Sequence, residues 1–157
     1  MRGEKAFHGK YRKLNQLRDE IHENAKNKGF WDNPRETGTL LMLCVSELAE
    51  ALEADRREKY CDLMRYYEKR QDEFIFKRKQ ETDPMFYPRS PELVLTDDEI
   101  EKQTFEHHVK DTFEDELADA VIRILDLCGA KGIDIEKHIE LKMEYNATRE
   151  RMHGKKY

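Results

Sequence analysis

Apolar residues recur at intervals of three and four along much of this chain, and this spacing constrains its fold more than any other feature. Such intervals place side chains on one face of an α-helix, whereas a half-buried strand needs strict alternation. No alternating stretch of useful length occurs. We therefore predict an all-α protein with four principal helices, whose apolar positions are residues 7–25, 40–52, 113–128 and 135–147.

Local signals predict where these helices begin and end. Glycines past the last apolar position favour helix ends, and Ser, Thr, Asp or Asn favours a start. The signals are Gly29 after the first helix, Thr37 or Thr39 at the start of the second, the run 111–114 before the third, Gly129 and Gly132 after it, and Asp134 before the fourth.

Between the second and third helices lies a long, charged stretch with scattered aromatic residues, at about residues 56–110. Pro84, Pro88 and Pro91 exclude a helix interior from Thr82 to Leu95, because proline removes a helical hydrogen bond. The run Thr96-Asp-Asp-Glu99 is a capping box that restarts a short helix toward His108. We predict a partly helical insertion in a four-helix-bundle-like fold, with residues 1–157 forming a single domain.

The composition narrows the class of protein. Charged residues make up 40% of the chain, and 29 Lys and Arg against 34 Asp and Glu give a net charge of −5. No stretch approaches the roughly 20 apolar residues of a membrane span, and the first residues lack the apolar core of a signal peptide. Three cysteines without a CxxC pair are typical of free thiols. We expect a cytoplasmic protein with neither a membrane nor a stable nucleic-acid partner.

Two pairs of acidic residues stand on apolar helices. Glu47 and Glu50 are three residues apart among apolar neighbours of the second predicted helix, and Glu116 and Asp119 repeat the arrangement on the third. If the two helices face each other, four carboxylates converge and repel unless a cation compensates them. Oxygen ligands favour Mg²⁺ or Mn²⁺ over Zn²⁺, and Mg²⁺ is commonly shared with substrate phosphates. The alternative is that both pairs are surface acids bonded to Lys or Arg one turn away.

The last predicted helix carries complementary chemistry. Lys142, Asn146 and Arg149 are spaced by four and three residues, so two cations and an amide would share a face that can meet phosphate oxygens. A solvent-facing basic stripe is the alternative. Trp31 at a helix junction could stack on a base, or pack in the core.

Together these residues resemble the MazG-like nucleoside triphosphate pyrophosphatases, the all-α relatives of dimeric dUTPase and dCTP pyrophosphatase. The resembling segments are LCVSELAEALE at 43–53, FEDELADAVI at 113–122, KMEYNATR at 142–149 and GFWD at 29–32. The family's acid-rich pattern is matched at Glu47, Glu50, Glu116 and Asp119.

The resemblance implies a Mg²⁺-dependent enzyme, with Mn²⁺ a possible substitute, that cleaves a nucleoside triphosphate between its α- and β-phosphates. The products would be the monophosphate and pyrophosphate, and the role would be house-cleaning of the nucleotide pool. The four acids would hold Mg²⁺, with one glutamate assisting as general base. Lys142, Asn146, Arg149 and Trp31 would contact the substrate. Relatives are homodimers or homotetramers.

Two features depart from the family pattern. Ser46 stands where the family usually has its first glutamate, and the stretch between Glu50 and Glu116 is considerably longer than the family's spacer. An alternative function is therefore a non-catalytic interaction protein on the same fold, with the insertion as its partner surface.

Overall fold

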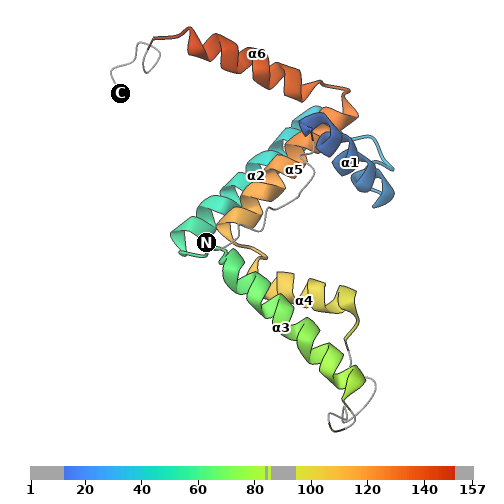
Figure 1. Cartoon of the computed structure of the whole chain (residues 1–157). Helices are drawn as coiled ribbons and strands as arrows, with labels where there is room; N and C mark the ends of the chain where they lie inside the picture. Colours follow the sequence, from blue (N-terminus) through green and yellow to red (C-terminus); the bar gives the residue numbers. More distant parts are fainter. Residues whose placement is uncertain (1–12, 84, 86–94, 151–157) are drawn as a thin grey trace. The chain divides into compact units, whose positions relative to one another are not determined.

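The computed structural model describes residues 13–83, 85 and 95–150, and in these residues it contains six helices and no strand. The all-α prediction is confirmed (Figure 1). The helices are α1 (Leu14–Asn27), α2 (Thr37–Arg56), α3 (Leu63–Thr82), α4 (Asp97–His108), α5 (Phe113–Ala130) and α6 (Ile135–Ala147).

The chain divides into two compact units, which are described separately below. The central unit runs from Leu43 to Ala120, and the terminal unit combines the chain up to Met42 with the chain from Val121 onwards. The boundaries fall inside α2 and inside α5. That residues 1–157 form a single domain stays a prediction.

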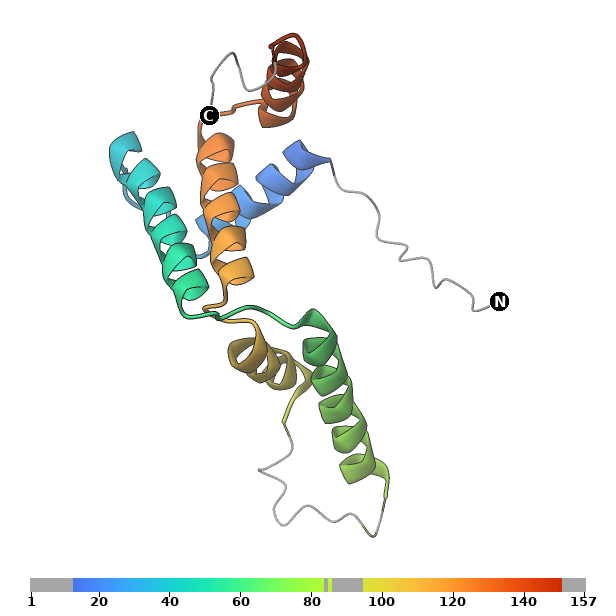
Figure 2. The same ribbon diagram turned by 90° about the vertical axis from the view of Figure 1, so that its left-hand side faces the viewer.

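In the central unit, the C-terminal part of α2 and the N-terminal part of α5 lie side by side (Figures 1 and 2). The buried apolar positions on these parts are small: Cys44, Ala51 and Ala54 on α2, and Ala120 on α5. The Phe113 backbone N–H donates to the Lys59 carbonyl oxygen at 2.9 Å, which ties the start of α5 to the turn after α2. Small side chains let helix backbones approach closely, so polar side chains between these two helices are brought near one another.

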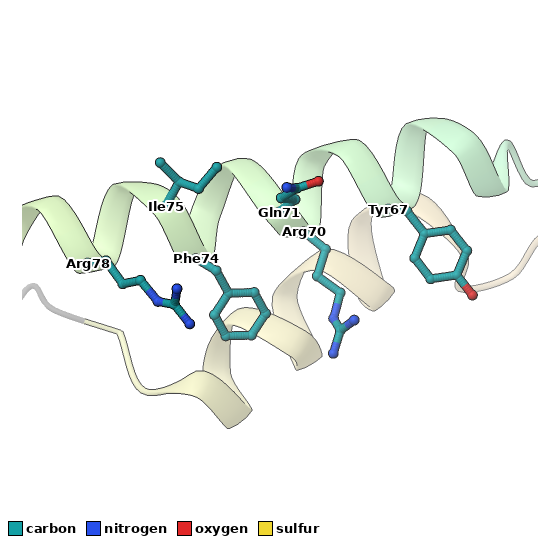
Figure 3. A pocket seen from close by; sticks show the side chains of 6 residues that line it. All are labelled: Tyr67, Arg70, Gln71, Phe74, Ile75 and Arg78. Carbon is teal, nitrogen blue, oxygen red and sulfur yellow. The ribbon is translucent and has the colours of Figure 1, made fainter. Parts of the chain in front are cut away.

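The helices α3 and α4 lie within the stretch predicted as a charged insertion. They pack on each other around Ile100, which is 2% exposed, and ion pairs join Arg70 to Glu101 and Lys77 to Asp97. Figure 3 shows aromatic rings and guanidinium groups alternating along α3 in a hollow lined by Tyr67, Arg70, Gln71, Phe74, Ile75 and Arg78. Two of these groups also contact each other, with the Arg70 guanidinium 5.4 Å from the Phe74 ring centre.

The predicted ends of these two helices agree with the structure. Thr96 and Glu99 form the expected capping box, and α4 ends at His108. The helix α3 ends at Thr82, where the predicted break begins. Pro84, Pro88 and Pro91, on which that prediction depended, lie outside the described residues.

In the terminal unit, α1 and α6 contact each other near their first residues. The Asn15 amide donates to Asp134 Oδ1 at 2.7 Å, and Arg18 Nη1 donates to the Ile133 carbonyl oxygen at 2.5 Å. Asp134 also accepts from the Lys137 N–H, which confirms its predicted role as the cap of α6. Polar contacts therefore fix the start of α6 on α1.

The glycine signals were correct in part. Gly29 and Gly132 follow α1 and α5 in the left-handed region, with φ of 79° and 62°, as a helix end requires. Gly129 does not close α5, which continues to Ala130. Instead, a Cβ added at Gly129 would lie 2.5 Å from the Cβ of His22, so this glycine allows α1 to approach α5.

Two expectations from composition can be compared with the structure. No disulfide joins Cys44, Cys61 and Cys128 in the structure. Among the described helices, none combines the length and the apolar character that crossing a membrane requires.

The close approach at Gly129 predicts an unfavourable alanine substitution. Gly129→Ala should lower the free energy of unfolding by about 1–3 kcal/mol, because a methyl group meets a side-chain stem that cannot swing away. Gly38→Ala is the matched control: Gly38 lies in α2 with open space around it, so alanine should raise stability by up to about 1 kcal/mol. Urea unfolding followed by circular dichroism measures both, and equal midpoints would contradict the packing described here.

Candidate metal centre

Three carboxylates from two helices meet in the central unit. Glu47 comes from α2, and Glu116 and Asp119 come from α5. One carboxylate oxygen from each lies within 4.8 Å of the others. Glu47 and Glu116 are buried, with 7% and 6% of their surface exposed, while Asp119 is exposed. We call these three residues the carboxylate cluster.

The helical spacing explains why the two buried acids face inward. On α2 the buried residues are Cys44, Glu47, Ala51 and Ala54, so Glu47 occupies one position of a single buried face. On α5, Glu116 lies one turn from Thr112 and one turn from Ala120, both of which are buried. The interpretation that both pairs are surface acids therefore does not hold for Glu47 and Glu116.

The fourth predicted ligand, Glu50, lies at the edge of this arrangement. It is exposed and is not one of the three cluster residues. Glu50 and Glu116 line the same hollow. Among the charged neighbours of Glu116, Glu50 raises the pKa of the Glu116 carboxyl the most. The structure thus brings three of the four predicted carboxylates together and places Glu50 next to them.

The environment of Glu116 disfavours its charged form. Burial raises the pKa of the Glu116 carboxyl, and the negative charges around it raise the pKa further; these belong to Glu50, Asp115, Asp119 and Glu47. Both effects would be relieved by positive charge placed between the carboxylates. The surroundings of Glu116 therefore favour either a protonated carboxyl or a nearby cation.

A hollow of about 250 Å³ lies beside the cluster in the same unit. We call it the carboxylate hollow, and it is lined by Glu50, Glu53, Ala54, Arg57, Lys59, Asp111 and Glu116. Two cations therefore face the same space as the acids. Arg57 and Lys59 are not among the site residues predicted from the sequence, although the spacing of four between Glu53 and Arg57 is the spacing of neighbouring side chains at a helix end.

Trp31 lies in the terminal unit and is bound by residues of that unit. Its indole N–H donates to the two carboxylate oxygens of Asp126, at 3.0 and 3.2 Å, and its ring meets the edge of His22 with centres 5.2 Å apart. His22 Nδ1 is itself 2.7 Å from Asp126 Oδ1. Of the two predicted roles, packing is the one that the described contacts support.

The predicted phosphate-binding residues Lys142, Asn146 and Arg149 are exposed in the terminal unit. Lys142 Nζ lies 5.2 Å and the Arg149 guanidinium carbon 5.8 Å from the centre of the Tyr145 ring. The prediction that all three share one helix face was wrong for Arg149, because α6 ends at Ala147. Arg149 lies in the turn after the helix, where its backbone N–H donates to the Asn146 carbonyl oxygen. This turn brings the arginine side chain to Tyr145.

Comparisons of the chain with protein-family models, with curated proteins and with solved structures found no match.

The raised pKa of Glu116 makes a prediction for the metal-free protein. An ordinary glutamate ionises near pH 4.5, and the folded state holds this proton to higher pH. The free energy of unfolding therefore falls as pH rises from 4.5 through the folded-state pKa. Glu116→Gln has no carboxyl to ionise and removes this loss, so in EDTA at pH 7.5 its melting temperature should lie above that of wild type.

The difference between the two melting temperatures should shrink toward pH 4, where wild-type Glu116 is protonated as well. Glu68→Gln is the control, because Glu68 is an exposed residue of α3 in the same unit. A melting temperature of Glu116→Gln below wild type at pH 7.5 would show that the ionised carboxylate is well stabilised without metal.

Proposed function

We propose that this protein is a Mg²⁺-dependent nucleoside triphosphate pyrophosphohydrolase of the MazG-like type. It would cleave NTP or dNTP between the α- and β-phosphates, release the monophosphate and pyrophosphate, and so clear surplus or non-standard nucleotides. The observation that carries the proposal is the carboxylate cluster. Its acids come from the two sequence motifs that resemble the family pattern, and they meet on neighbouring helices.

The donor set of the cluster fits a hard divalent cation. All three ligating groups are carboxylates, and their oxygens are near enough to one another to bind one ion. Two of the three are buried, and burial raises the pKa of one of them, Glu116. Oxygen donors without Cys or His favour Mg²⁺, with Mn²⁺ as a substitute, over Zn²⁺.

The residues divide the chemistry between them. Glu47, Glu116 and Asp119 would hold the cation, which when bound supplies positive charge to phosphate oxygens. Glu50 lies outside the cluster but on the same hollow, so we assign it the general base. The oxygen of a water molecule would form a new bond to one of the two phosphorus atoms of the α–β anhydride, and one water proton would move to the Glu50 carboxylate. The bond between the attacked phosphorus and the α–β bridging oxygen would break, so that the monophosphate and pyrophosphate are released. The resemblance instead implies that Glu50 is a fourth metal ligand, but Glu50 is not one of the three cluster residues.

Contacts to the nucleoside stay predictions from the resemblance. Lys142, Asn146 and Arg149 are exposed and so are accessible to phosphate oxygens. The Trp31 ring is partly exposed, although its N–H is bonded to Asp126. These four residues belong to the terminal unit, and their role in substrate binding is part of the proposal.

A homodimer or homotetramer is also part of the proposal. Val45, Leu48 and Leu52 are spaced by three and four residues on α2, and each has about half of its surface exposed, at 51%, 50% and 48%. An apolar stripe of this kind normally packs against another helix. A second copy of the chain would supply such a helix.

The decisive experiment is a panel of NTPs and dNTPs incubated with the protein and Mg²⁺, with pyrophosphate and monophosphate both quantified. We expect equal amounts of the two products from at least one nucleotide, and none after EDTA treatment. Release of inorganic phosphate and a diphosphate would place the scission elsewhere. No product from any nucleotide would favour the non-catalytic interaction protein.

Two variants test the residues within the same assay. Glu50→Gln and Asp119→Asn should each abolish turnover, because one loses the base and the other a metal ligand, while helicity stays nearly unchanged since both residues are exposed. Glu68→Gln is the matched control and should turn over at the wild-type rate. Unaltered rates in both site variants would show that the reaction takes place elsewhere on the chain.

A further inference from the structure

The carboxylate hollow contains two cations to which the proposed function gives no role. We propose that Arg57 and Lys59 bind the phosphate groups of a polyphosphate whose metal ion is held by the carboxylate cluster. The inference rests on the proposed function and names the part of the site that receives the phosphate chain. The ligand of this site would be a metal-bound di- or triphosphate.

The backbone holds both residues at the edge of the hollow. The Lys59 N–H donates to the Ala54 carbonyl oxygen at 2.9 Å, and the Arg57 N–H to that of Glu53 at 3.2 Å, which closes the end of α2 as a tight turn. The Lys59 carbonyl oxygen in turn accepts from the Phe113 N–H. The two cations are thus carried by a segment that is fixed to both helices of the cluster.

Unusual backbone conformations flank the same space. Glu58, between the two cations, has φ of 54°, and Asp111, which lines the hollow, has φ of 58°. Among the described residues these are the non-glycine positions in the left-handed region. At Glu58 this conformation belongs to the turn that ends α2, where the Glu58 N–H donates to the Asp55 carbonyl oxygen at 2.9 Å, so the turn sets the positions of the backbones of Arg57 and Lys59.

Each cation has an acidic neighbour that a phosphate could replace. Arg57 Nη2 lies 2.8 Å from Glu53 Oε1, and Lys59 Nζ lies 3.6 Å from Asp111 Oδ2. The side chains are substantially exposed, at 71% for Arg57 and 47% for Lys59, and exposed ion pairs contribute little free energy. Two oxygens of a phosphate group can accept the paired N–H groups of the guanidinium, as the Glu53 carboxylate can, so a phosphate is able to take the place of the acid.

The charges that line the hollow explain why the ligand must bring or meet a metal ion. Four acids, Glu50, Glu53, Asp111 and Glu116, face two cations there. Without metal this surplus of negative charge repels a polyphosphate. A divalent cation on the cluster, which also contains Glu47 and Asp119, lowers the negative charge of the site, and Arg57 and Lys59 then attract phosphate oxygens more strongly. Phosphate binding should therefore depend on the metal and on Arg57 and Lys59 together.

Calorimetric titration with inorganic tripolyphosphate tests this inference without any need for turnover. Mg²⁺ is kept in excess in both cell and syringe, and a parallel series contains EDTA. Wild type should bind with Mg²⁺ and not in EDTA. Arg57→Gln and Lys59→Gln should each raise the Kd about tenfold or more, the usual effect of losing one charge-assisted hydrogen bond, and the double variant further.

Arg56→Gln is the matched control, because Arg56 is the neighbouring exposed arginine, lies 3.8 Å from Glu53, and does not line the hollow. Its Kd should stay within about twofold of wild type. Circular dichroism should show equal helicity in all variants, because the hydrogen bonds that hold this turn come from the backbone.

The outcomes separate this inference from the proposed function. Binding that depends on Arg57 and Lys59, without release of pyrophosphate from any nucleotide, would support the phosphate site and overturn the enzyme. If the protein turns over a nucleotide but the double variant binds tripolyphosphate with an unchanged Kd, the phosphate site is overturned and the proposed enzymatic function still stands. Absence of tripolyphosphate binding in wild type, or an equal loss in Arg56→Gln, would also overturn the phosphate site.

Discussion

The burial of two carboxylates, Glu47 on α2 and Glu116 on α5, is the constraint on which the central unit depends. Each is less than a tenth exposed, and Glu116 is in addition surrounded by the negative charges of Glu50, Asp115 and Asp119. A buried acid without compensation is unfavourable, and the pKa of Glu116 is raised accordingly. The arrangement is therefore most stable when positive charge is available, and this requirement connects the packing of the two helices to a chemical role.

Other features of the central unit hold this arrangement in place. Small buried residues such as Ala51, Ala54 and Ala120 let the two helices approach, and the bond from Phe113 to Lys59 fixes the start of α5. The pair α3 and α4 carries its own buried residue, Ile100, and its own ion pairs. The long stretch between the acidic motifs thus has a packing that does not draw on the cluster residues.

Most of the helices could be predicted from the sequence because their signals are local. Thr96 caps α4 through a glutamate three residues on, Asp134 caps α6, and the period of apolar residues locates α2 and α5. Acids on apolar helix faces likewise indicated Glu47 and Glu116. The rest depended on contacts distant in sequence. Arg57 and Lys59 face the hollow because α2 ends beside the start of α5, and Gly129 serves the approach of His22 rather than a helix end.

The need of the buried acids for a cation can be measured by titrating the protein with Mn²⁺ and following the electron paramagnetic resonance signal of the free ion. Wild type should remove Mn²⁺ from solution at a saturable site, and added Mg²⁺ should release it. Glu47→Gln and Glu116→Gln should each lose this site, because each replaces a buried carboxylate of the cluster with a neutral amide. Glu68→Gln should keep it. Equal Mn²⁺ binding by all four proteins would show that the carboxylate cluster does not hold a metal ion.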